Sequence, residues 1–118
     1  MSQAGSVAAS RAKARFEALK REVLQLDFVR PGSLVRRFMP CGNHSCRCMG
    51  QPARLHGPYY QWSHKVAGRT VTLRLSADQA KLCRQWVSNH KRLRRLVRQM
   101  ERLSLKETDQ FLGAISRS

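Results

Sequence analysis

The sequence predicts an α+β fold in which two long helices, paired antiparallel like a coiled coil, flank a cysteine-rich segment and a β-hairpin. Three observations predict it. They are two stretches with apolar residues at helical spacing, two alternating strands around a short turn, and a cluster of cysteines before those strands. The chain of 118 residues has about the length of one domain, and we expect a single domain.

Residues 6–28 are predicted to form the first helix. Its apolar residues recur at positions i, i+3, i+7 and i+10, which gives a narrow apolar seam with the basic residues mostly off it. The Pro31-Gly32 dipeptide then interrupts the chain. The seam consists of Phe16, Leu19, Val23 and Leu26.

Residues 30–58 show little regular periodicity and are rich in glycine and proline, so we expect this segment to need an organising element. Residues 59–75 are predicted to form a β-hairpin, with strands over 59–66 and 69–75 joined at Ala67-Gly68. Apolar and polar residues alternate in the second strand, which is typical of a hairpin with one packed face.

Residues 76–103 are predicted to form a long basic helix, opened by a capping box in which Ser76 and Gln79 bond each other's backbone. Residues 104–118 are a short further helix or a tail. We expect the two apolar seams to pair antiparallel within one chain; a parallel homodimer through the second helix is the alternative. The second seam, with Asn89 as a polar register marker, consists of Leu82, Trp86, Asn89, Leu93, Leu96, Met100 and Leu103.

Three cysteines and a histidine follow the spacing Cys41-x4-Cys46-x-Cys48-x7-His56. Three thiolates and one imidazole are a common closed ligand set for structural zinc, and nearby glycines permit the tight loop that such a site needs. We therefore predict a zinc knuckle in segment 30–58, with these four residues as ligands and Zn²⁺ as the cofactor.

The fourth ligand has alternatives, and so has the cluster as a whole. His44 lies inside the loop, and Cys83 in the second helix would have to fold back, although a small buried residue beside the seam explains Cys83 better. The alternatives to a metal site are a set of reduced, metal-free thiols and a redox or thiol-transfer site.

A catalytic zinc usually has a carboxylate base nearby, and residues 28–77 contain no Asp or Glu. We therefore expect no enzymatic activity.

The formal net charge of +16, from 23 Lys and Arg against 7 Asp and Glu, indicates a polyanionic partner. Nucleic acid is favoured over a membrane surface, because the apolar seams are narrow and no apolar run approaches the roughly 20 residues of a membrane span. No signal-peptide pattern opens the chain, so we expect a cytoplasmic protein in a reducing compartment.

Arginine predominates over lysine, which suits bidentate contacts to phosphate and stacking on bases. Tyr59, Tyr60 and Trp62 beside Arg69 and Arg74 are a candidate platform for single-stranded bases. The packed face of the hairpin explains Tyr60 and Trp62 better, which leaves Tyr59 for contact. Solvation of the helices is the alternative for the charges, although solvated faces usually mix both signs. The predicted nucleic-acid-binding residues are Arg36, Arg37, Arg47, Arg54, Tyr59, Arg69, Arg74, Lys91, Arg92, Arg94, Arg95 and Arg98.

Several short motifs stand in order along the chain. They are Arg-Pro-Gly-Ser-Leu-Val-Arg-Arg over 30–37, Cys-Gly over 41–42, Cys-Arg-Cys over 46–48 and His-Gly-Pro-Tyr-Tyr over 56–60, followed by a basic hairpin and a long helix. Over roughly residues 30–100, this order resembles an uncharacterised family of small prokaryotic proteins often encoded in transposons, integrative elements and prophages. The resemblance implies a mobile-element context, with DNA and a transposase or recombinase as partners. It also implies that His44 and Cys83 lie outside the signature, whereas Cys41, Cys46, Cys48 and His56 belong to it.

The sequence thus predicts a zinc-stabilised nucleic-acid-binding accessory protein of a mobile genetic element, associated with a transposase or recombinase. One alternative is a protein-interaction adaptor that docks or dimerises through the heptad helix. Another is an RNA-binding protein. An enzyme has the weakest support, because no acid–base pair can be placed near the cysteines.

Overall fold

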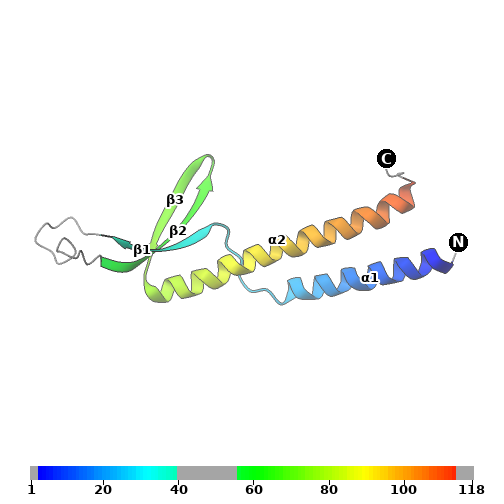
Figure 1. Cartoon of the computed structure of the whole chain (residues 1–118), viewed down its shortest axis with the longest axis horizontal. Coiled ribbons are helices and arrows are strands. Elements are labelled where there is room, and N and C mark those ends of the chain that lie inside the picture. The colour runs from blue at the N-terminus through cyan, green and yellow to red at the C-terminus, as the bar shows by residue number, and fades with distance from the viewer. Residues whose placement is uncertain (1–2, 40–55, 114–118) are drawn as a thin grey trace, which may run out of the picture. The chain divides into compact units, whose positions relative to one another are not determined.

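The computed structural model describes residues 3–39 and 56–113 (Figure 1). The elements follow one another as α1 (Gln3–Leu24), β1 (Ser33–Met39), β2 (His56–Val66), β3 (Arg69–Leu75) and α2 (Ala77–Leu112). The fold is α+β, with two helices and one three-stranded antiparallel sheet among the described residues. The α+β prediction is therefore confirmed, whereas the zinc knuckle and the coiled-coil character of the helix pairing stay predictions.

Contacts divide the chain into two compact units, which we name the helical unit (residues 1–27 and 91–118) and the sheet unit (residues 28–90). Helix α2 contributes to both of them. The expectation of a single domain stays a prediction. Each unit has its own buried residues and is described separately below.

Strand β1 is the element that the sequence analysis missed. It pairs antiparallel with β2 in the strand order β1-β2-β3. Of its side chains, Leu34 packs against the core, whereas Val35 and Phe38 are 37% and 47% exposed. The strand therefore lacks the alternation of buried apolar and exposed polar residues by which strands are recognised in a sequence.

The β2–β3 hairpin confirms the prediction for residues 59–75, and β2 starts a little earlier, at His56. Its turn contains Ala67 and Gly68, with φ angles of 51° and 79°. Two successive positive φ angles give the two-residue turn whose twist matches that of paired strands. Beyond the pair Ser33–Ser63, the hairpin continues without pairing to β1 (Figure 1).

The pairing register assigns the side chains to two faces, because residues directly opposite each other on neighbouring strands share a face. One face carries the row Leu34–Trp62–Leu73. The other face carries the row Val35–Gln61–Arg74 and the pair Arg37–Tyr59. The first face packs on α2 and is called the packed face; the second is called the open sheet face.

The core of the sheet unit consists of Trp62 from β2 and Cys83 and Val87 from α2, which are all less than 10% exposed. Leu34 and Leu75 pack against these three residues at its edge. The predicted role of Trp62 on the packed face of the hairpin is confirmed by this burial.

The segment before β1 is held against the core by backbone hydrogen bonds. The Arg30 amide donates to the Trp86 carbonyl at 3.0 Å, and Asn89 Nδ2 donates to the Phe28 carbonyl at 3.0 Å. Asn89 therefore fixes this extended segment, which is a different role from the register marker of a helix seam. The predicted first helix does not reach residue 28, because α1 ends at Leu24.

Gly32 lies against the indole of Trp62. Its φ is +112°, and a Cβ atom at this position would lie 2.5 Å from Trp62 Nε1 and 2.6 Å from the Ser63 carbonyl oxygen. Only glycine fits such a conformation and such a close approach. Beside it, Trp62 Nε1 donates to the Pro31 carbonyl at 2.8 Å. The Pro31-Gly32 break therefore has a packing function.

Helix α2 begins with the predicted capping box. The Ser76 amide donates to Gln79 Oε1 at 2.9 Å, and the Gln79 amide donates to Ser76 Oγ at 3.1 Å. The helix continues through residues 104–112, where a short separate helix or a tail was expected, and is followed by Gly113 with a φ of +69°. A glycine with positive φ is a common helix C-terminus.

The buried positions of α2 do not follow the predicted heptad seam throughout. Ala80, Cys83 and Val87 are buried in the sheet unit, whereas Leu82 is 51% exposed, so the seam prediction is wrong at Leu82. The physical reason is that this part of α2 packs on a sheet, which favours its small residues. In the helical unit the prediction holds at Leu96, which is 4% exposed.

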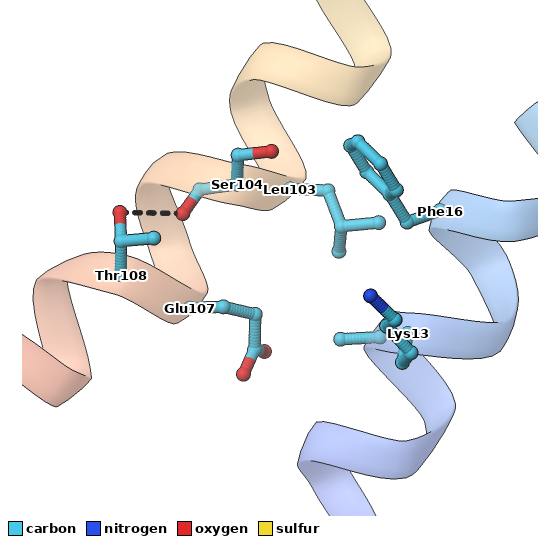
Figure 2. A pocket seen from close by; sticks show the side chains of 7 residues that line it. Lys13, Phe16, Leu103, Ser104, Glu107 and Thr108 are labelled. Atoms are coloured by element: carbon cyan, nitrogen blue, oxygen red, sulfur yellow. Dashed lines mark hydrogen bonds between the residues drawn. The ribbon is translucent and has the colours of Figure 1, made fainter. Parts of the chain in front are cut away.

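The helical unit contains α1 and the C-terminal part of α2, running in opposite directions. Leu19 is 2% exposed, and Arg92 Nη2 donates to Glu22 Oε1 at 3.0 Å. Figure 2 shows Phe16 of α1 and Leu103 of α2 beside an open pocket that both helices line. The seam residue Leu19 is therefore buried as predicted.

Candidate nucleic-acid interface

The predicted zinc ligands Cys41, Cys46 and Cys48 lie outside the described residues, as do His44, Arg47 and Arg54. His56 is described by its backbone, which opens β2 and pairs with Met39 at the end of β1. Within the described ranges 3–39 and 56–113, no group of three His, Cys, Asp or Glu side chains lies together. The zinc site therefore stays a prediction.

Of the four cysteines, Cys83 is the one that lies within the described residues. Its environment differs from that of a metal ligand. It is 3% exposed and packs with Trp62 and Val87. Burial raises the pKa of its thiol, an effect that the charge of Arg30 partly opposes. A thiol binds metal as a thiolate, which this environment disfavours. The interpretation of Cys83 as a small buried core residue is confirmed.

The open sheet face is polar and basic. Arg37, Lys65 and Arg74 are exposed on it, and Tyr59 is half-buried. Their face follows from the pairs Arg37–Tyr59, Gln61–Arg74 and Lys65–Thr70, and from the alternation of side chains along each strand. Its remaining residues are Ser33, Val35, Gln61, Ser63, Thr70 and Thr72. This face contains no acidic residue.

Tyr59 and Arg74 form a stacked pair on the open sheet face. Arg74 Cζ lies 4.1 Å from the centroid of the Tyr59 ring, a distance typical of a cation–π contact. Stacking uses the flat face of the guanidinium and leaves the N–H groups at its edge free to bind an anion. The prediction that Tyr59 lies on the face opposite Trp62 is confirmed by the register.

The structure separates residues that the sequence analysis grouped. Arg36 shares the packed face with Tyr60, and its Cζ lies 5.1 Å from the centroid of the Phe38 ring. Arg69 pairs with Val66 beside the hairpin turn and lies on the same side as Arg36. Arg37 and Arg74 thus remain together, whereas Arg36 and Arg69 point to the other face.

Lys65 is a residue of the open sheet face that the predicted set omitted. Tyr59, Gln61, Ser63 and Lys65 alternate along β2, and residues two apart in a strand share a face. The signal was therefore present in the sequence, as an alternation that starts from Tyr59.

Four basic residues of α2 form a second basic surface, which we name the helix stripe. They stand at i, i+3, i+4 and i+7, which places them on one face of a helix, and all are exposed. Arg92 lies off the stripe and is bonded to Glu22. The helix stripe consists of Lys91, Arg94, Arg95 and Arg98.

A further finding concerns the helices as a group. Neither α1 nor α2, as far as the structure describes them, has a stretch that is both long and apolar enough to cross a membrane.

Comparison with known proteins gives a family and no function. Residues 10–85 match the family described as domain of unknown function DUF6788. No curated protein and no solved structure matches the chain. The matched region contains the C-terminal part of α1, the whole sheet and the start of α2. Because this match spans more than half of the chain, the protein belongs to the DUF6788 family.

Proposed function

We propose that the protein is a non-enzymatic nucleic-acid-binding accessory factor of a mobile genetic element, stabilised by zinc. The observation that carries the binding function is that three arginines of the sheet unit contact aromatic rings and not carboxylates. Arg30, Arg36 and Arg74 lie over the rings of Trp62, Phe38 and Tyr59. No carboxylate pairs with them among the described residues.

Unpaired arginines on a segment with a single acidic residue favour a polyanion. Asp78 is the only acidic residue of residues 28–90, and it lies in the first turn of α2. Binding to phosphates replaces the counterions that such a surface otherwise collects, so affinity should fall steeply with salt. The open sheet face and the helix stripe are the two described surfaces that would contact phosphate.

The test is nucleic-acid binding measured over a series of salt concentrations, with wild type and with the double variant Arg94→Ala, Arg95→Ala. Log affinity falls as log salt concentration rises, and each lost phosphate contact should make this slope less steep by about 1. The matched control is Arg11→Ala, Arg21→Ala on α1, which removes the same charge from residues outside the predicted set. Absence of binding by wild type at low salt would contradict the proposal.

Zinc is proposed as the element that organises segment 30–58. The donor set Cys41, Cys46, Cys48 and His56 has the thiolate and imidazole chemistry of structural zinc sites. The pairing of Met39 with His56 supports this proposal, because it brings together the two ends of the segment that carries the cysteines. Bound zinc would supply folding energy there.

Metal analysis of the purified protein tests the zinc site. We expect about one zinc per chain, and Cys46→Ser should lose the metal and lower the melting temperature. Cys83→Ala is the matched control, since it removes a thiol that we place in the core, and it should keep the metal. A stable wild-type protein without metal would refute this part of the proposal.

The mobile-element context and a transposase or recombinase partner rest on the motif resemblance alone. Co-purification of the protein with a transposase or recombinase encoded beside it tests this partner. Binding of nucleic acid without any such association would leave the accessory role unsupported.

An adaptor function is the second candidate, because apolar residues at the end of α2 are uncovered. Leu105, Phe111 and Leu112 are 61%, 89% and 72% exposed. The pocket beside Phe16 and Leu103 is open as well (Figure 2). Such residues are common where helices dock or self-associate. Sedimentation would show a concentration-dependent dimer if α2 mediates self-association, and a stable monomer would count against it.

A further inference from the structure

On the open sheet face, the stacked side chains of Tyr59 and Arg74 form a flat surface. The guanidinium lies over the tyrosine ring at 4.1 Å, and the arginine is exposed. Both aromatic rings and guanidinium planes are surfaces on which unpaired bases stack. One plane of this pair therefore faces outward and is available to a base.

Basic side chains surround this stacked pair on the same face. Arg37 is directly opposite Tyr59 on β1, and Lys65 lies further along β2. Gln61 stands opposite Arg74 and provides an amide for hydrogen bonding. The surface thus combines a stacking plane, cations for a backbone and a polar group for a base edge.

We infer that the open sheet face binds single-stranded nucleic acid, DNA or RNA, with a base stacked on the Tyr59–Arg74 pair and phosphates near Arg37 and Lys65. This inference rests on the proposed function and names its substrate class. Bases inside a duplex are already stacked on one another and offer no free ring face. The major groove admits a helix or a two-stranded ribbon, whereas this surface spans three strands.

The experiment measures the affinity of the full-length protein for three fluorescent probes of equal length. The probes are a single-stranded oligothymidylate, a single-stranded oligouridylate and a DNA duplex. Wild type should bind both single strands more tightly than the duplex, and the better of the two identifies DNA or RNA as the preferred source. Tyr59→Leu should weaken single-strand binding about fivefold or more and leave duplex binding nearly unchanged.

Two further variants separate stacking from charge and from folding. Arg74→Lys keeps the charge and removes the planar group, so it should also weaken single-strand binding selectively. Tyr59→Phe keeps the ring and should bind as wild type. The matched control is Arg84→Lys on α2, which makes the same substitution at an exposed arginine outside the predicted interface and should have little effect.

The outcomes distinguish this inference from the proposed function. If Tyr59→Leu and Arg74→Lys leave single-strand binding unchanged, or weaken single strand and duplex equally, the inference is refuted and nucleic-acid binding as such stands. If wild type binds none of the three probes at low salt, both the inference and the proposed function are refuted.

Discussion

The two units of the molecule use their arginines and lysines differently. In the helical unit, Glu17 pairs with Lys13 and Lys20, and Glu22 pairs with Arg92. In the sheet unit, Arg30, Arg36 and Arg74 contact aromatic rings instead, and Arg30 Cζ lies 4.0 Å from the centroid of the Trp62 ring. The sequence explains the difference, because every acidic residue except Asp78 belongs to the helical unit.

Basic charge remains available to a partner where no carboxylate pairs with it. An exposed ion pair stabilises a protein by at most about 1 kcal/mol, yet it does satisfy part of the charge of the basic residue. An arginine stacked on a ring keeps its edge N–H groups unpaired. Arg30, Arg36 and Arg74 of the sheet unit therefore keep cationic hydrogen-bond donors that no described carboxylate satisfies.

The largest expected effect comes from removing the residue on which the sheet unit is built. Trp62→Ala should destabilise that unit by about 3–5 kcal/mol, because it leaves a cavity and removes the bond to the Pro31 carbonyl. Hydrogen exchange followed residue by residue should show the loss of protection in β1, β2 and β3.

Leu19→Ala is the counterpart in the helical unit, where Leu19 is 2% exposed. It should reduce protection in α1 and leave the strands protected. If either variant removes protection equally from both units, the division into two separately packed units is wrong.

A smaller effect is expected at Gly32, where β1 approaches the indole. Gly32→Ala places a Cβ 2.5 Å from Trp62 Nε1 at a φ of +112°, so strain and contact together should cost about 1–3 kcal/mol. Urea denaturation measures this cost. The control is Gly68→Ala, since Gly68 has a φ of +79° but nothing within 4 Å of an added Cβ. Equal costs for both variants would show that the contact with Trp62 contributes nothing.

The smallest effect concerns the ion pair of the helical unit. Glu22→Gln should change stability by less than about 1 kcal/mol, because both partners are partly exposed. It releases Arg92, so the salt slope of nucleic-acid binding should steepen by up to about 1. Glu17→Gln is the control with the same charge change, and it releases no residue of the predicted interface. Identical slopes for the two variants would mean that Arg92 does not contact phosphate.

The pH dependence of the sheet unit follows from Cys83. Because burial raises the pKa of its thiol, the folded state favours the protonated form. This contribution to stability is complete below the thiol pKa of the unfolded chain and is lost as the pH rises through the higher pKa of the folded state. In thermal unfolding, the melting temperature of wild type should therefore fall more at alkaline pH than that of Cys83→Ala. Parallel curves for the two proteins would contradict this assignment.

Local patterns in the sequence determined the hairpin, the start of α2 and the side of Tyr59. The capping box at Ser76 and Gln79 involves residues three apart, so its bonds depend on nothing distant. The alternation of side chains in a strand likewise places Tyr59 opposite Trp62 without any tertiary information. The burial of Leu19 followed from helical spacing in the same way.

Which residues meet across the chain depends on tertiary packing. Strand β1 is stabilised by pairing with β2, and its own residues lack the alternation by which a strand is recognised in a sequence. Cys83 and Val87 of α2 are buried against residues of the sheet and not against a second helix, whereas Leu82 is exposed. Arg36 and Arg37 are adjacent in sequence, yet the register of β1 on β2 places their side chains on opposite faces of the sheet. The stacking of Arg74 on Tyr59 joins two strands, and no spacing along one chain segment specifies such a contact.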